Sequence, residues 1–288
     1  MKILVIGGTG TIGSRVVNGL LSKGVNVNVM TRDPAKATAL PKGATAVFGN
    51  LSDPHATRDS FKGIDRVFML NAASTAEAYE GIMGVLLAKD ADVGRFVYMS
   101  THRADLTEFL PIGGGTKLPV EKAVAISGMP FTILRPNNFF QNDYWYKDSM
   151  LNDGIYPQPI GFKGMSRVDA RDIADVAVTT LLNEGHAGQT YNITGPRVET
   201  GPSSAAAWST ALNRTIEYAG NDMELFERMH GFMGSALVNV YRRFYEFYQE
   251  HGLFATEEDI AGTTRLLGHS PRSLESFAIE TAKEWAAK

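Results

Sequence analysis

The sequence predicts an α/β protein with a doubly wound parallel sheet, and three observations support this. Short β-rich runs alternate with segments of helix length through the first half of the chain, as in βαβ units. Several runs are almost continuously apolar, which is typical of strands that helices cover on both faces. Glycines precede the runs, where helices end and turns begin. We expect strands at residues 3–6, 25–30, 44–48, 66–70, 96–99 and 131–134.

The second half of the chain changes character and predicts a smaller, mainly helical C-terminal lobe. Residues 168–182 have apolar side chains at helical spacing, residues 189–193 resemble a further strand, and both are expected to return to the first sheet. The expected division is a first domain of residues 1–138, joined by residues 165–196, and a lobe formed by residues 139–164 and 197–288.

A glycine-rich loop follows the first predicted strand and opens the first predicted helix. Gly8, Gly10 and Gly13 have the spacing GxGxxG, and Gly7 offers a second register. Such glycines permit a tight turn, close approach of the backbone to a pyrophosphate, and close packing of helix on strand. The helix N-terminus adds N–H groups for phosphate. This context predicts a Rossmann-like domain that binds a dinucleotide through Gly7, Gly8, Thr9, Gly10, Thr11, Ile12 and Gly13.

The end of the second predicted strand favours NADP(H). An acidic residue there usually binds the ribose 2′-hydroxyl of NAD, whereas an arginine accommodates a 2′-phosphate. Arg32 follows Thr31 at this place, and Lys36 lies one helical turn further on. The planar guanidinium donates two bonds to phosphate at once. Asp33 is adjacent and able to pair with Arg32, which leaves NAD(H) as an alternative.

The third and fourth predicted strands also end in residues that we expect at the cofactor. Ligands of such sheets lie beyond the carboxyl ends of the strands. Small side chains after the fourth strand leave room for the nicotinamide side. The residues concerned are Asn50, Leu51, Asn71, Ala72 and Ala73.

Composition excludes several classes of function. The 288 residues include 28 Lys and Arg against 31 Asp and Glu, and the net charge of -3 does not favour nucleic acid. The absence of cysteine excludes disulfides, thiol catalysis and cysteine-ligated metals. The histidines form no HExxH pair, and no apolar run has the length of a membrane span. Without a recognisable leader, we expect a cytoplasmic protein with no metal, nucleic-acid or membrane partner.

Motifs spread over nearly the whole chain resemble those of the NmrA-like atypical short-chain dehydrogenases/reductases. Besides the glycine loop, they are TRDPAK at residues 31–36, FTILRP at 131–136, YNITGP at 191–196 and LGHSPRSLESF at 267–277. The resemblance implies an NAD(P)-binding protein similar to quinone and dye reductases, to isoflavone-type reductases, or to redox-sensing regulators that bind NADP without turnover.

The resemblance also implies catalytic residues. Standard short-chain dehydrogenases use a tyrosine acid/base, a lysine four residues later, and a serine or threonine after the fifth strand. Lys117 resembles the lysine, which also holds the nicotinamide ribose, and Thr101 resembles the Ser/Thr, but Gly113 stands in the place of the tyrosine. Two other interpretations make Lys117 a ribose ligand only, or a surface cation after a flexible glycine loop. Thr101 is otherwise a strand-end hydrogen-bonding residue.

His102, Phe139 and Phe140 are candidates for contact with substrate, because they follow the fifth and sixth predicted strands. Aromatic residues are more often part of a core, so a structural role is the alternative. We expect an NADPH-dependent oxidoreductase that transfers hydride to a planar apolar acceptor, quinone-like or polycyclic aromatic. The alternative is a non-catalytic NADP(H)-binding redox sensor acting on a partner protein. The partner expected is a small apolar or aromatic substrate, and a homodimer or a regulatory protein partner is compatible with the sequence.

Overall fold

The computed structural model describes residues 1–110 and 113–287. They form two compact units, each of which contains two segments of the chain. The first unit is Met1–Pro136 with Ala170–Asn192, and the second is Asn137–Asp169 with Ile193–Lys288. In the described part of the chain, no helix combines the length and the apolar character needed to cross a membrane.

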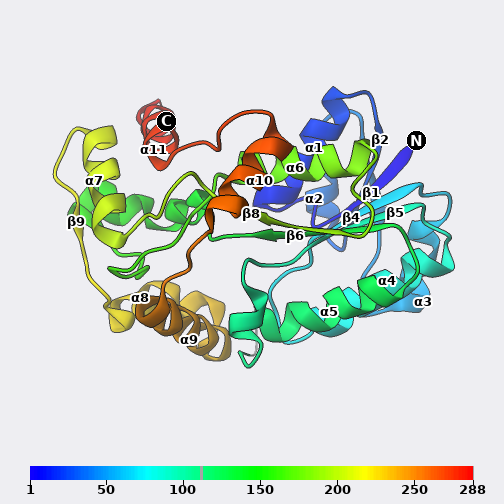
Figure 1. Ribbon diagram of the computed structural model, residues 1–288, viewed down its shortest axis with the longest axis horizontal. Helices are drawn as coiled ribbons and strands as arrows, with labels where there is room; N and C mark the ends of the chain where they lie inside the picture. The colour runs from blue at the N-terminus through cyan, green and yellow to red at the C-terminus, as the bar shows by residue number, and fades with distance from the viewer. Residues whose placement is uncertain (111–112, 288) are drawn as a thin grey trace. The chain divides into compact units, whose positions relative to one another are not determined.

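The first unit is built on a seven-stranded sheet whose strand pairs run parallel, as predicted. The strand order β3-β2-β1-β4-β5-β6-β8 makes the sheet doubly wound, with β1 between its two halves (Figure 1). Ligands of such sheets bind where the order reverses, outside the carboxyl ends of the strands. The strands are β1 (Lys2–Ile6), β2 (Asn26–Thr31), β3 (Ala44–Phe48), β4 (Arg66–Met69), β5 (Arg95–Met99), β6 (Phe131–Pro136) and β8 (Gln189–Ile193).

Helices cover both faces of this sheet. Helices α1 and α6 pack together on one face, and α4 and α5 pack together on the other (Figure 1). The central strands are therefore apolar on both sides, which explains the continuous apolar runs of the sequence. The helices are α1 (Thr11–Ser22), α2 (Pro34–Thr38), α3 (Pro54–Thr57), α4 (Glu77–Asp90), α5 (Gly114–Ile126) and α6 (Ala170–Leu182), with short 3₁₀ helices at Arg58–Phe61 and Ala104–Thr107.

The second unit is mainly helical, as predicted, but it also contains a two-stranded parallel sheet that the sequence analysis missed. Strands of two residues are too short for a periodicity signal. Its elements are β7 (Ile155–Tyr156), β9 (Glu217–Tyr218), α7 (Gly201–Leu212), α8 (Met223–His230), α9 (Ser235–His251), α10 (Glu257–Leu267) and α11 (Leu274–Ala286), with 3₁₀ helices at Phe140–Tyr146 and Gly231–Met233 and a π-helix at Ser149–Asp153.

A fully buried ion pair organises the core of the second unit. Arg167 donates to Asp143 at 2.6 Å and to the Tyr156 hydroxyl at 3.0 Å. The Trp208 indole N–H donates to the other Asp143 oxygen at 2.9 Å. Burial raises the pKa of the Tyr156 hydroxyl well above its ordinary value. This phenol therefore stays neutral, and the carboxylate's bonds from Arg167 and Trp208 offset the loss of its hydration.

The boundary between the units differs from the predicted one. The predicted first domain includes residues 137–138, 165–169 and 193–196, but these three segments belong to the second unit. The Met165 N–H donates to Glu199 O, and the Val168 N–H donates to Asn138 O, so residues 165–169 pair with backbone of the second unit. The return to the first unit therefore begins only with helix α6.

Candidate cofactor and active site

A cavity of about 510 Å³ opens in the first unit at the carboxyl ends of β1, β2, β3 and β4. This is the place where a doubly wound sheet binds its ligand. The cavity brings together most of the residues that the sequence predicted at the cofactor. They are Gly7, Thr9, Gly10, Thr31, Arg32, Lys36, Asn50, Leu51, Asn71, Ala72 and Ala73.

Three of the remaining residues of the glycine loop, Gly8, Ile12 and Gly13, pack closely against the protein. A Cβ atom at Gly8 would lie 2.7 Å from a Val29 methyl group, and one at Gly13 would lie 2.1 Å from the carbonyl oxygen of Gly7. Ile12 is buried in the core, whereas Thr11 is exposed at the start of α1. The loop thus depends on the absence of side chains to approach both strand and helix.

Gly10 is different from its neighbours, because the protein itself does not require a glycine there. Its φ is -91°, a value open to other residues, and a Cβ would come no closer than 3.4 Å to any protein atom, the carbonyl oxygen of Gly7. Gly10 lines the cavity and caps α1 without a side-chain hydrogen bond to the helix. A pyrophosphate at the helix N-terminus gives a physical reason for the missing side chain.

Asn71 adds a second feature that fits a dinucleotide. Its Nδ2 donates to the carbonyl oxygen of Glu77 at 2.7 Å. Its Oδ1 is buried and accepts no hydrogen bond from any residue that the structure describes. A buried acceptor without a donor costs about 1–3 kcal/mol. A cofactor hydroxyl or amide in the adjoining cavity would remove this penalty, so the residues present fit the group.

Arg32 pairs with a residue that the sequence analysis did not identify. The Arg32 Nη1 lies 3.8 Å from Glu80 Oε1, and Glu80 also accepts from the Ser52 hydroxyl at 2.6 Å. Asp33, which was considered as the partner of Arg32, instead caps α2 by accepting from the Ala35 N–H at 2.9 Å. The Arg32 side chain is 65% exposed, so this pair is weak and leaves the guanidinium available to a phosphate.

Lys117 lies in the first turn of α5 with only 11% of its side chain exposed. Its Nζ is 2.7 Å from Glu77 Oε1 and donates to the carbonyl oxygen of Met99, at the end of β5, at 3.3 Å. The preceding glycines are tightly packed, since a Cβ at Gly114 would lie 2.0 Å from Ala104 O. The interpretation of Lys117 as a surface cation after a flexible loop is therefore wrong.

The place of the usual tyrosine is shaped for glycine. Gly113 has a φ of 70° and precedes α5, so a side chain there would be strained. Tyr98 is nearby in β5, but its side chain is buried. Burial is the main cause that raises the pKa of Tyr98 well above its ordinary value, and the negative charges of Glu77 and Glu121 raise it further. The Tyr98 phenol therefore stays protonated, and Tyr98 is not among the residues that line the cavity.

The structure separates the other candidates by their exposure. Thr101 follows β5 and is half-buried. His102 is 0% exposed, so the expectation that its ring faces a substrate does not agree with this structure. Its backbone N–H donates to the carbonyl oxygen of Pro136 at 2.9 Å, which fixes the residue beside β6.

Of the two phenylalanines expected at the substrate, Phe140 belongs to the core of the second unit. Its ring is 0% exposed, and the centroids of the Phe140 and Phe277 rings are 5.6 Å apart. The Arg167 guanidinium lies over the Phe140 ring, 5.6 Å from its centroid. The expectation for Phe140 is therefore corrected to a packing role. Phe139 is half-buried and remains a candidate for substrate contact.

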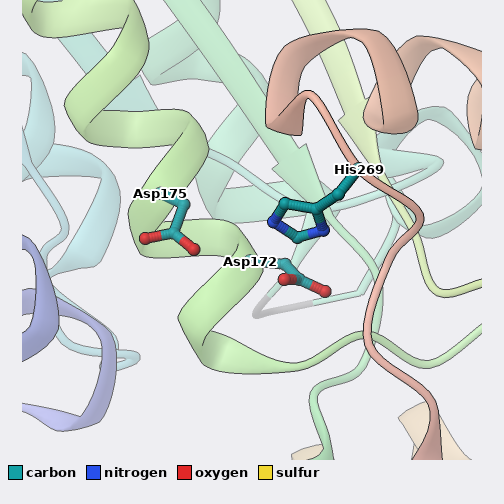
Figure 2. A group of neighbouring side chains, drawn as sticks. All are labelled: Asp172, Asp175 and His269. Atoms are coloured by element: carbon teal, nitrogen blue, oxygen red, sulfur yellow. The ribbon is translucent and has the colours of Figure 1, made fainter.

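Three potential metal ligands are not among the residues that line the cavity (Figure 2). Asp172 and Asp175 project from α6 in the first unit, whereas His269 follows α10 and belongs to the second unit. The three residues do not form a site within either unit, and we assign no metal ion to them.

Comparisons with known proteins agree with this geometry. The model of the NmrA-like family matches residues 1–278. The NAD(P)H azoreductase of Xenophilus azovorans is 31% identical over 297 residues, which cover 99% of this chain and 99% of that protein. The structure of the Escherichia coli NADPH-dependent quinone oxidoreductase complexed with NADPH superimposes with a TM-score of 0.83 at 23% identity, over 97% of this chain and 99% of that chain.

A second solved structure, the Citrobacter sp. triphenylmethane reductase complexed with NADP(H), has a TM-score of 0.84 at 20% identity, over 98% of this chain and 100% of that chain. At these identities the two structures support the fold, and the family match over residues 1–278 supports the relationship itself. The resemblance inferred from the motifs is confirmed: this chain belongs to the NmrA-like family.

Proposed function

We propose that this protein is an NAD(P)H-dependent reductase that prefers NADPH and transfers hydride to a planar, conjugated acceptor such as an azo compound or a quinone. The observation that carries the proposal is the cavity of the first unit, which joins the glycine loop, Arg32 and an unsatisfied Asn71. Lys117 lies in the same unit at the carboxyl end of β5. The azoreductase and the quinone and dye reductases among similar proteins support this class of acceptor.

The residues of the chain have separate tasks in such a reaction. Gly10 and the N-terminus of α1 bind the pyrophosphate, and Arg32 and Lys36 bind the 2′-phosphate. The reduced nicotinamide, when bound, supplies the hydride. Lys117 binds the nicotinamide ribose and holds a proton at Nζ for the atom of the acceptor that becomes basic as it is reduced. The half-buried Thr101 hydroxyl orients the acceptor.

Steady-state oxidation of NADPH with a panel of acceptors tests this function. We expect turnover with an azo dye, a quinone or a triphenylmethane dye, and none with a saturated ketone. A conjugated acceptor spreads the developing charge and needs little acid assistance, whereas an isolated carbonyl needs the donor that Gly113 replaces. Failure of every conjugated acceptor would contradict the reductase. A cofactor-dependent change in limited proteolysis would then identify a redox sensor.

Cofactor preference depends on Arg32 in this proposal. We expect tighter binding of NADPH than of NADH, and we expect Arg32→Ala to weaken NADPH roughly ten- to hundredfold with little effect on NADH. A charge-assisted contact of this kind is worth about 1.5–3 kcal/mol. Calorimetric titration of both cofactors into both proteins measures the effect.

Arg58→Ala is the matched control for this titration. Arg58 is as exposed as Arg32, at 65%, and is likewise paired with an acidic side chain, Asp90, but it does not line the cavity. We expect the Arg58→Ala variant to bind NADPH and NADH with the affinities of the wild type. Equal affinities of the wild type for NADPH and NADH would refute the preference.

A further inference from the structure

We propose that Glu77 is a positioning residue that holds the Lys117 ammonium in its working place. This inference rests on the proposed function, because it concerns the group that we place at the nicotinamide ribose and the acceptor. The Glu77 side chain is 1% exposed, and its Oε1 lies 2.7 Å from Lys117 Nζ. No feature of the sequence motifs points to Glu77, which begins helix α4, as part of this site.

Glu77 is itself fixed from several sides. The Thr116 hydroxyl donates to its Oε2 at 2.5 Å. Its backbone carbonyl accepts from Asn71 Nδ2 at 2.7 Å, and Asn71 lines the cofactor cavity. Glu77 therefore connects the end of β4 and the starts of α4 and α5. A carboxylate held in this way presents one oxygen to Lys117 in a defined direction.

The contacts of Lys117 fix its ammonium and still leave N–H donors for a ligand. An ammonium group has three N–H donors and no acceptor. One donates to the carbonyl oxygen of Met99 at 3.3 Å, and Glu77 Oε1 lies 2.7 Å from Nζ as the partner of the ion pair. The Tyr98 ring, 5.5 Å from Nζ, lies beside the charge as well. The side chain has four rotatable bonds, and without Glu77 its ammonium would sample several positions.

The electrostatic setting explains why a carboxylate is needed at this place. Lys117 lies in the first turn of α5, where the helix dipole disfavours a positive charge. Glu77 lies in the first turn of α4, where the dipole favours a negative charge. A buried ion pair generally adds little stability over apolar residues of similar size. Stability alone therefore does not explain the buried pair of Glu77 and Lys117, whereas a role of Glu77 in placing the ammonium does.

Turnover and binding measured on matched variants test the inference. In Glu77→Gln we expect turnover to fall roughly ten- to hundredfold, the loss typical of a misplaced catalytic group, with NADPH affinity within a few-fold of the wild type. Glu77→Asp should recover part of the loss. Thr116→Val, which removes the hydroxyl but keeps the charge, should lose less than Glu77→Gln. The pH profile of turnover is a second readout, because Glu77→Gln removes the carboxylate that lies 2.7 Å from Nζ.

Glu121→Gln is the control for disruption of a buried ion pair. Glu121 lies in α5, its side chain is 7% exposed, and it pairs with Arg135 rather than with Lys117. We expect Glu121→Gln to keep wild-type turnover and the wild-type pH profile. Equal losses of turnover in Glu77→Gln and Glu121→Gln, with unchanged pH profiles, would show a merely structural role and overturn the inference.

Competitive acetylation of Lys117 by acetic anhydride, read by mass spectrometry, gives an answer that does not depend on turnover. The reagent must reach Nζ, and only 11% of the Lys117 side chain is exposed while it is paired with Glu77. We expect labelling of Lys117 to rise in Glu77→Gln and to stay at the wild-type level in Glu121→Gln. Unchanged labelling in Glu77→Gln overturns the inference. If the wild type fails to oxidise NADPH with every acceptor of the panel, the proposed function is refuted. The labelling experiment still decides the role of Glu77 in that case.

Discussion

Removal of the Lys117 ammonium is expected to lower turnover by about 10²–10⁴-fold, the usual contribution of a general acid or base. Affinity for NADPH is expected to fall by only about 0.5–1.5 kcal/mol, the value of one lost hydrogen bond to the ribose. The two roles of Lys117 therefore differ in magnitude. Steady-state kinetics of Lys117→Met, together with calorimetric titration of NADPH, separates them.

A single substitution at Lys117 leaves the buried Glu77 carboxylate without its counter-charge, which costs about 3–5 kcal/mol of stability. The double variant Lys117→Met/Glu77→Gln removes both charges and keeps the volume of the side chains. We expect it to fold as the wild type does, by circular dichroism and thermal unfolding, and to show the same loss of turnover. A small and parallel loss of turnover and of NADPH affinity would show that Lys117 only binds the nicotinamide ribose.

Substitution of Gly10 by valine is expected to abolish detectable binding of NADPH and NADH alike while the protein stays folded. The φ of -91° and the distance of 3.4 Å from a Cβ to the nearest protein atom show that the backbone tolerates a side chain. The side chain would instead occupy the cavity in front of the α1 N-terminus. Loss of two charge-assisted bonds to phosphate amounts to about 3–6 kcal/mol, or roughly 10²–10⁴-fold in affinity.

Gly231→Val serves as the control for Gly10→Val. A Cβ at Gly231 meets no protein atom within 4 Å, and the residue belongs to the second unit. We expect this variant to bind NADPH as tightly as the wild type. Gly10→Ala should give an intermediate affinity, because a methyl group fills less of the cavity. Tight binding of NADPH by a folded Gly10→Val variant would show that the pyrophosphate lies elsewhere.

The sequence by itself determined the strands of the seven-stranded sheet, the glycine loop and the place of Arg32. Each of these depends on neighbours within a few residues: the apolar period of a covered strand, the backbone freedom of glycine, and the position after β2. The six strands predicted in the first half, at residues 3–134, are all present, with ends that differ by at most a few residues. The cofactor cavity followed from them, because the carboxyl ends of parallel strands meet at one edge.

The tertiary structure alone decided which charged groups meet and which aromatic rings are buried. Glu77 and Thr116 are 39 residues apart in sequence, and Arg167 and Asp143 are 24 apart, beyond the reach of any local pattern. Phe140 and Phe139 are neighbours of the same type, yet only Phe140 enters the core. Such contacts depend on how α4 packs against α5, and on how the second unit closes around its own core. A linear spacing carries no signal for these arrangements, because they are set by packing between distant segments.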